Sequence, residues 1–151
     1  MKTLTLKACL LLTLLTAATA NAQSTIAKPK LFSTFPDKII CSQQELNKVF
    51  SASVNQNLSV NFSSDFLFNG IVTSNVVKYS SLQTAVIRSA AFDGAILVLS
   101  RITNADNTTS YVGRIINTKY FDGYELQKDA VNNYQLVKIE TDKVIQVCSQ
   151  Q

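Results

Sequence analysis

The spacing of hydrophobic positions changes near residue 57. Before that point, Leu46, Val49 and Phe50 recur at the three- and four-residue spacing of one helix face. After it, apolar residues occupy every second position, which is typical of a strand with one buried face. The first such run consists of Leu58, Val60 and Phe62, alternating with Ser59 and Asn61. The pattern therefore predicts a short helical part followed by a long β part.

The helix is predicted over residues 42–54. Ser42 and Glu45 form a capping-box pattern. In this pattern the serine side chain accepts a hydrogen bond from the backbone N–H three residues later, and the glutamate side chain accepts one from the backbone N–H of the serine. The polar segment 55–57 ends the helix. The preceding segment 23–38 contains two prolines and has no sustained period, so we interpret it as a flexible lead-in.

Turn signals separate a series of strands in the rest of the chain. The Asp-Gly pairs at 93–94 and 122–123 are turn sequences, and the segments 104–107 and 131–133 are polar loops or turns. The segment 95–102 is apolar on both faces, which predicts a central strand covered on both sides. Extended segments are predicted at 58–62, 66–79 (one bent strand or two short ones), 82–90, 95–102, 110–116, 124–128, 134–140 and 144–147.

Closely spaced turns without a second helix favour an antiparallel meander over parallel βαβ units. The predicted fold class is α+β, with an N-terminal helix followed by a curled antiparallel meander sheet of about six strands. A small mainly-β barrel or sandwich is the alternative, because the segment 95–102 requires cover on both faces. We expect one globular domain over residues 39–151.

The N-terminus has the three parts of a secretory signal peptide. Lys2 and Lys7 supply positive charge, residues 8–15 form an apolar run, and Ala20-Asn21-Ala22 provides the small side chains that signal peptidase requires. We predict cleavage after Ala22 and export to the periplasm or the extracellular space. The apolar run is too short to span ~30 Å of hydrocarbon comfortably, so no integral membrane segment is expected after cleavage.

Removal of the signal peptide changes both the charge and the cysteine count. It leaves 12 of the 14 cationic side chains against 10 acidic ones, a net charge of +2 with no run of like charge, so nucleic acid is not an expected partner. Two cysteines remain, Cys41 and Cys148. In an oxidising compartment this pair predicts one disulfide, with two separate buried thiols as the alternative.

The residue inventory excludes several kinds of catalysis. The chain contains no histidine, which removes Ser-His-Asp and Cys-His nucleophile systems and the histidine-containing zinc sites. Its four glycines stand at single positions, so it has no glycine-rich phosphate loop. The aspartates lie mostly at turns, where they bond to the turn backbone. We therefore expect a non-enzymatic protein without a cofactor or metal site.

Two groups of residues remain as candidates for binding. Aromatic rings flanked by a cation project from the predicted turn after residue 116, and such rings give contact area at low entropic cost. This group consists of Lys119, Tyr120, Phe121 and Tyr124. The alternative for the whole stretch 111–128 is an ordinary hairpin, in which Arg101 lies opposite Tyr111.

The second candidate group consists of three arginines in apolar strands, Arg88, Arg101 and Arg114. Two of them on one sheet face could hold a carboxylate or a sulfate, whereas separate arginines extend to the rim of a sheet.

The sequence predicts a small exported binding or interaction module whose partner is another protein or a glycan. One alternative is a secreted protease inhibitor or a pro-domain-like chaperone. Another is an envelope structural protein that associates with itself through an exposed apolar sheet face. An enzyme that combines carboxylates with tyrosine or arginine in a pocket is a further alternative.

Overall fold

The computed structural model describes residues 28–144. The predicted signal peptide, the last three residues of the predicted strand 144–147 and Cys148 lie outside this range. No helix in the described range is long and apolar enough to cross a membrane. The elements are β1 (Lys38–Cys41), α2 (Gln43–Phe50), β2 (Asn57–Ser63), β3 (Phe66–Tyr79), β4 (Leu82–Arg88), β5 (Ile96–Thr103), β6 (Thr109–Ile116), β7 (Asp122–Lys128), β8 (Tyr134–Glu140) and α3 (Thr141–Val144).

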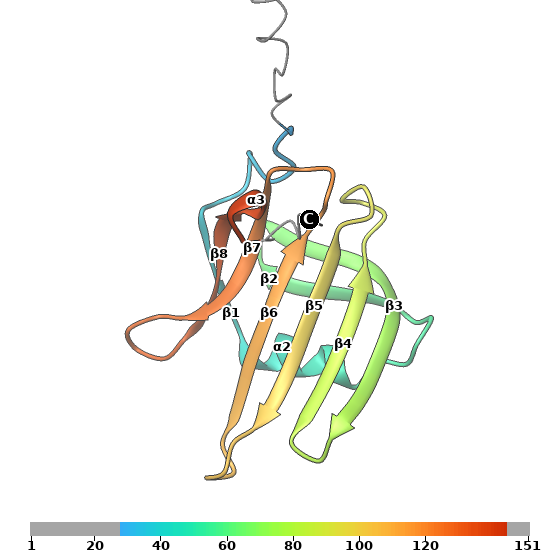
Figure 1. Cartoon of the computed structure of the whole chain (residues 1–151), viewed down its shortest axis with the longest axis vertical. Helices are drawn as coiled ribbons and strands as arrows, with labels where there is room; N and C mark the ends of the chain where they lie inside the picture. The colour runs from blue at the N-terminus through green and yellow to red at the C-terminus, as the bar shows by residue number, and fades with distance from the viewer. Residues whose placement is uncertain (1–27, 145–151) are drawn as a thin grey trace, which may run out of the picture.

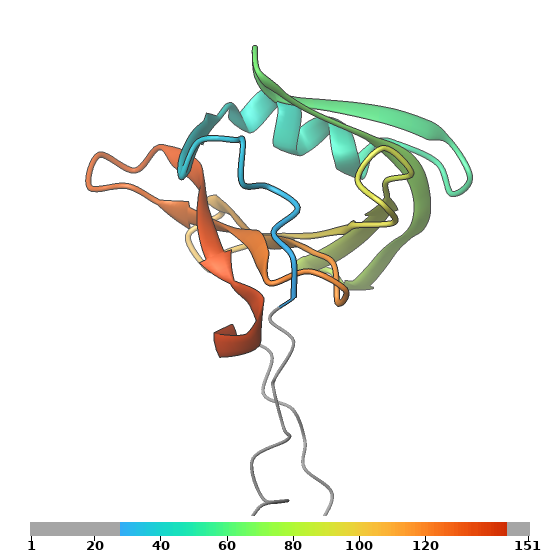
Figure 2. The same ribbon diagram turned by 90° about the horizontal axis from the view of Figure 1, so that it is seen from above.

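The described strands form one antiparallel sheet of eight strands in the order β1-β8-β7-β6-β5-β4-β3-β2. The sheet curls into a nearly closed barrel, which is visible as a ring in Figure 2. The prediction of an α+β meander with about six strands was therefore wrong in part, and its barrel alternative fits the structure. Six of the seven neighbouring strand pairs are hairpins, as expected for a meander.

The strand that sequence analysis missed is β1, and it nearly closes the barrel. Its four residues pair with β8, from Lys38 opposite Val137 to Cys41 opposite Tyr134. A four-residue strand shows at most two alternations, too few to distinguish it from a loop by its hydrophobic period. Because β1 precedes all other strands and pairs with the last one, it brings the beginning and the end of the described chain together.

Helix α2 lies at the seam between β1 and β2, the two strands at the edges of the sheet (Figures 1 and 2). The predicted serine cap is confirmed, since the Oγ atom of Ser42 accepts the N–H of Glu45 at 3.2 Å. The Glu45 carboxylate, however, accepts the backbone N–H of Asn61 at 2.9 Å, and Lys48 donates to the carbonyl of Ser59 at 2.9 Å. Side chains of α2 thus partner backbone groups on the exposed edge of β2.

The barrel is filled by inward-facing side chains and by the N-terminal segment 28–37. Phe32 in this segment is completely buried and its ring contacts Phe66 and Tyr124 edge-on, with centroids 6.0 and 5.3 Å apart. Leu46, Val49 and Phe50 of α2 complete the core, as the helical period predicts. The N-terminal segment is therefore packed against the barrel over its described part.

The central position of the strand predicted at 95–102 is confirmed, because β5 lies between β4 and β6. Cover on both faces was expected as well, and there the structure differs. Leu97 and Leu99 point into the core and are about 1% exposed, whereas Ile96 and Val98 on the other face remain half-buried. Among the described residues no element packs across that outer face, and Figure 1 looks onto it directly.

The turn predicted at Asp122–Gly123 was also wrong, because these residues begin β7 and the loop occupies residues 117–121. Gly123 is required here by a close approach of strands. A β-carbon at this position would lie 2.4 Å from the carbonyl oxygen of Ile115 on β6. Gly123 therefore allows β6 and β7 to lie close together, and Asp122 accepts long-range hydrogen bonds, so the pair does not form a turn.

Candidate binding surface

The loop 117–121 connects β6 to β7 at one end of the barrel and is held from several sides. Asn117 is buried, and its side-chain amide donates to the carbonyl of Asp93 at 2.9 Å. The backbone N–H of Phe121 donates to Pro29 at 2.9 Å. The Thr141 hydroxyl, at the start of α3, lies 2.9 Å from the carbonyl oxygens of both Tyr120 and Phe121. Contacts from three distant segments thus fix the loop backbone.

Two of the predicted binding residues on this loop converge on one carboxylate. Lys119 Nζ and the Tyr120 hydroxyl each lie 3.3 Å from Oδ2 of Asp93. Lys119 keeps 69% of its side chain exposed and Asp93 keeps 49%, so the ion pair is screened by water. Asp93 belongs to the loop between β4 and β5, in a left-handed backbone conformation with φ 48°. The pair therefore joins two loops at this end of the barrel without removing either charge from solvent.

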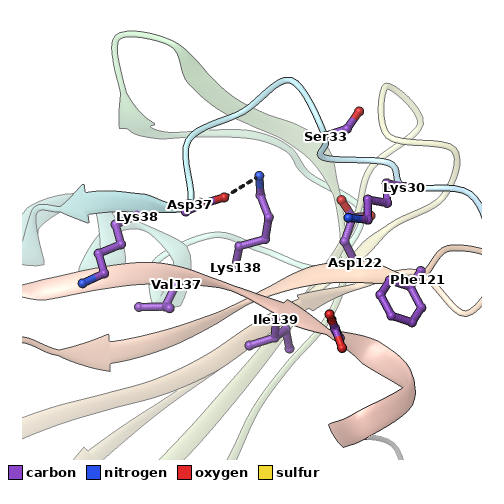
Figure 3. A pocket seen from close by; sticks show the side chains of 10 residues that line it. Lys30, Ser33, Asp37, Lys38, Phe121, Asp122, Val137, Lys138 and Ile139 are labelled. Atoms are coloured by element: carbon purple, nitrogen blue, oxygen red, sulfur yellow. Dashed lines mark ion pairs between the residues drawn. The ribbon is translucent and has the colours of Figure 1, made fainter.

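A hollow of about 480 Å³ lies on one side of the loop, against the N-terminal segment (Figure 3). Lys30, Ser33 and Asp37 form one wall, and β8 with Phe121 forms the other. Lys138 crosses between the walls, with its Nζ atom 3.0 Å from Asp37 Oδ1 and 2.7 Å from the carbonyl of Phe35. The complete lining is Lys30, Ser33, Asp37, Lys38, Phe121, Asp122, Val137, Lys138, Ile139 and Glu140.

The charges of this hollow are only partly paired. Asp122 is 2% exposed, and its two carboxylate oxygens accept the backbone N–H groups of Leu31 and Phe32. Lys30 and Lys38 are exposed and form no salt bridge within residues 28–144. Two exposed lysines therefore line this hollow, Lys30 on the wall near Phe121 and Lys38 at the opposite end (Figure 3).

A second hollow, of about 580 Å³, lies on the other side of the loop. It contains Arg88, at the end of β4, and Lys119, with Asp93 as the acidic residue. The Arg88 guanidinium donates to the Gly94 carbonyl at the long distance of 3.4 Å. Candidates from both predicted groups therefore meet at this hollow, since Arg88 belonged to the arginines and Lys119 to the aromatic stretch.

Tyr124 does not project from the loop as the sequence prediction required. It is completely buried, and its hydroxyl donates to the carbonyl of Pro36 at 2.7 Å. Burial raises the pKa of Tyr124 to about 12, and the nearby Asp122 and Asp37 carboxylates act in the same direction. Because β7 begins at Asp122, two residues earlier than the predicted strand, Tyr124 is the third residue of a strand instead of part of the loop, and its side chain lies on the core side.

The three arginines are not brought together. The pairing of Arg101 with Tyr111 across β5 and β6 is confirmed by the strand register. Arg101 shares the inner side of β5 with Leu99, whereas Arg114 lies on the outer side and forms a salt bridge of 2.7 Å with Glu125 on β7. The three arginines therefore do not form one cluster, although Arg88 and Arg114 both lie on the outer side of the sheet, on strands separated by β5. An anion site made by two of them stays a prediction, and Arg88 also lines the second hollow.

Arg101 belongs to a polar cluster at the end of α2. Its Nη2 atom donates to Gln83 at 2.6 Å, and its guanidinium carbon lies 5.1 Å from the centroid of the Phe50 ring. Gln83 and Asn75 in turn donate to the carbonyl of Phe50, at 3.2 and 3.1 Å. These amides satisfy a carbonyl that a helix end leaves without an intrahelical partner. These contacts hold the Arg101 side chain inside the cluster at the end of α2.

Cys41 is 4% exposed, and its thiol donates to the carbonyl of Ile39 at 3.4 Å. Burial raises the pKa of this thiol from 9.0 to about 12, against the opposite effect of a backbone hydrogen bond from Leu136. Since Cys148 lies outside the described residues, the disulfide remains a prediction. Within the described range, no three acidic, cysteine or histidine side chains are grouped so that they could hold a metal ion.

Comparison with protein-family models, curated proteins and solved structures finds no match for this chain. The surface is therefore defined by its own geometry. Sequence reasoning missed the part played by Asp93, Asn117 and the lysines of the first hollow. Of these residues, only Asp93 had a recognisable sequence pattern, the Asp-Gly turn pair at 93–94. The other contacts join segments that are far apart in the sequence, so no local pattern predicts them.

Proposed function

We propose that this protein is a small exported, non-enzymatic binding module that recognises another protein or a glycan through the loop 117–121. The observation that carries the proposal is the fixed loop backbone, which presents Lys119, Tyr120 and Phe121 between two hollows. A surface whose backbone is already ordered loses little conformational entropy when it binds. The absence of histidine from the sequence and the signal-peptide pattern favour a binding role outside the cytoplasm.

The charge of the surface indicates the chemistry of the partner. Lys30 and Lys38 beside the first hollow, and Arg88 beside the second, offer donors to an acidic group. The partly exposed rings of Tyr120 and Phe121 supply apolar contact area between them. A partner that carries carboxylates next to an apolar or sugar face fits this arrangement.

The test compares capture by the unchanged protein with capture by the variant K119A/Y120A/F121A, using envelope and medium of the producing organism. Tyr124 is left unchanged because it is buried, and its loss would disturb the core. The matched control is K128A/V131A, which changes the exposed last residue of β7 and one exposed residue of the loop between β7 and β8. We expect the loop 117–121 variant to lose a partner that the control retains.

Retention of the same partners by all three proteins would exclude this loop as the recognition surface. Both variants must keep the circular dichroism spectrum and the melting temperature of the unchanged protein. A captured protease whose activity is saturably blocked would assign the surface to inhibition.

A further inference from the structure

A third hollow, of about 660 Å³, lies where β3 and the end of β4 meet the loop between β4 and β5. In Figure 1 this loop stands beyond the arrowhead of β4. Four of the ten lining residues have no side chain or a single methyl group, namely Gly70, Ala90, Ala91 and Gly94. These small residues leave the space open, and its volume is that of a site for a small molecule. No residue of the loop 117–121 lines it.

The charge of this third hollow comes from Arg88 alone, since none of the other lining residues is ionisable. The strand register places Arg88 between Ile71 on β3 and Ile96 on β5. Ile71 is 46% exposed and Ile96 is half-buried, so apolar side chains flank the arginine on both sides. Such neighbours keep water away and strengthen the attraction between a guanidinium and an anion.

Arg88 has no acidic partner in the part of the chain that the structure describes, residues 28–144. The carboxylate of the adjoining loop, Asp93, contacts Lys119 and Tyr120 instead. Gly94 contributes only its carbonyl, at 3.4 Å from Nη1, and a β-carbon there would lie 3.7 Å from the same atom. The forked N–H donors of the guanidinium match a carboxylate, so a ligand can supply the charge that the protein does not.

We propose that the third hollow binds a free straight-chain carboxylic acid, with its carboxylate on Arg88 and its hydrocarbon chain over Ile71. Asn57, Ile71 and Arg88 are neighbours in one row across β2, β3 and β4. Two strand spacings cover ~10 Å. A hydrocarbon chain advances roughly 1.3 Å per bond, so a chain of roughly eight carbons crosses this row.

The lining also favours a monocarboxylate over other acids. It holds no carboxylate, so the ammonium group of an amino acid finds no partner there. It holds one cation, so the second carboxylate of a diacid finds none either. An unpartnered charge costs free energy when it leaves water. The apolar end of the ligand instead meets Ile71, Ala90 and Ala91.

The test is an NMR titration of the purified protein with butanoate, hexanoate, octanoate and octylamine. We expect octanoate to bind saturably and to shift amide signals of residues 69–73 and 88–94. Affinity should rise roughly two- to fourfold with each added methylene group, because each removes apolar surface from water. Octylamine should not bind, because its ammonium group meets a guanidinium.

R88Q should weaken octanoate binding at least about tenfold, because the charged partner of the carboxylate is lost. R114Q is the matched control, since Arg114 is held by Glu125 at 2.7 Å and does not line this hollow. I71S should leave butanoate binding nearly unchanged and flatten the rise in affinity with chain length. Melting temperatures of the three variants identify any loss of folding.

The proposal is overturned if the unchanged protein does not bind octanoate saturably, or if R88Q binds it as well as R114Q does. Tighter binding of N-acetyl-leucine than of hexanoate would also overturn it, because the site would then fit the end of a polypeptide better than a straight-chain acid. The inference does not rest on the proposed function. K119A/Y120A/F121A should bind octanoate normally, since none of its three changed residues lines the third hollow.

Discussion

The Oδ2 atom of Asp122 accepts the backbone N–H of Phe32 at 2.9 Å, and its Oδ1 atom accepts that of Leu31 at 2.6 Å. One carboxylate at the start of β7 thereby fastens the N-terminal segment to the barrel. The same segment forms a wall of the first hollow.

We expect D122A to lower the free energy of unfolding by about 3 kcal/mol, because it leaves two backbone N–H groups without acceptors in or near the core. Urea denaturation measures this change. The control is D142A, which removes an exposed salt bridge to Lys28 and should cost less than about 1 kcal/mol. Equal losses in the two variants would contradict the role assigned to Asp122.

Stability is expected to fall between pH 10 and pH 12. The pKa of Tyr124 is about 12 in the folded state and 10.0 in an ordinary environment, so ionisation favours the unfolded state. The stability that neutral Tyr124 contributes is complete below pH 10 and is lost as the pH rises through 12. Y124F removes the titrating group and should show a shallower fall in this window, measured by urea midpoints. Parallel curves for the two proteins would exclude Tyr124 as the source.

The thiol of Cys41 is expected to resist alkylation in the folded protein, because it is buried and its raised pKa keeps it protonated near neutral pH. With reductant present, alkylation should require denaturant. If the predicted disulfide with Cys148 is formed, denaturant alone will leave both cysteines unmodified and reductant will expose them together. Fast alkylation of Cys41 in native, reduced protein would contradict the burial.

Arg101 and Arg114 should differ in their effect on stability although both are strand arginines. R101A removes the hydrogen bond to Gln83 and the contact with the Phe50 ring, and should cost about 1–3 kcal/mol. R114A removes a largely exposed pair with Glu125 and should cost under about 1 kcal/mol. Thermal or urea unfolding of both variants makes the comparison. An Arg101 variant as stable as the Arg114 variant would show that the cluster at the end of α2 does not need its cation.

The elements that the sequence predicts correctly are those whose signals are local. The serine cap of α2 depends on residues three apart, and the pairing of Arg101 with Tyr111 follows from the length of one hairpin loop. The missed features depend on distant partners. Asp122 looks like a turn residue until its hydrogen bonds to Leu31 and Phe32 are known.

The binding surface was predicted only in part for the same reason. The aromatic stretch identified Lys119, Tyr120 and Phe121, but a one-dimensional pattern could not show that Tyr124 turns into the core. Nor could it bring Asp93 from another hairpin to the ammonium group of Lys119.

The pairing of β1 with β8 has a consequence for the order of folding. Every other strand pair in the sheet joins consecutive segments, so those hairpins can form while the chain is still being made. The partner of Lys38 is Val137, so β1 must wait until nearly the whole described chain has emerged. Until then the backbone N–H and C=O groups of β1 that later pair with β8 have no partner, and β1 is held near β2 only by the short connection through α2. The nearly closed ring is therefore expected to be the last part of the protein to assemble and the first to open, and slow-exchanging amides should appear in β4 to β6 before they appear in β1.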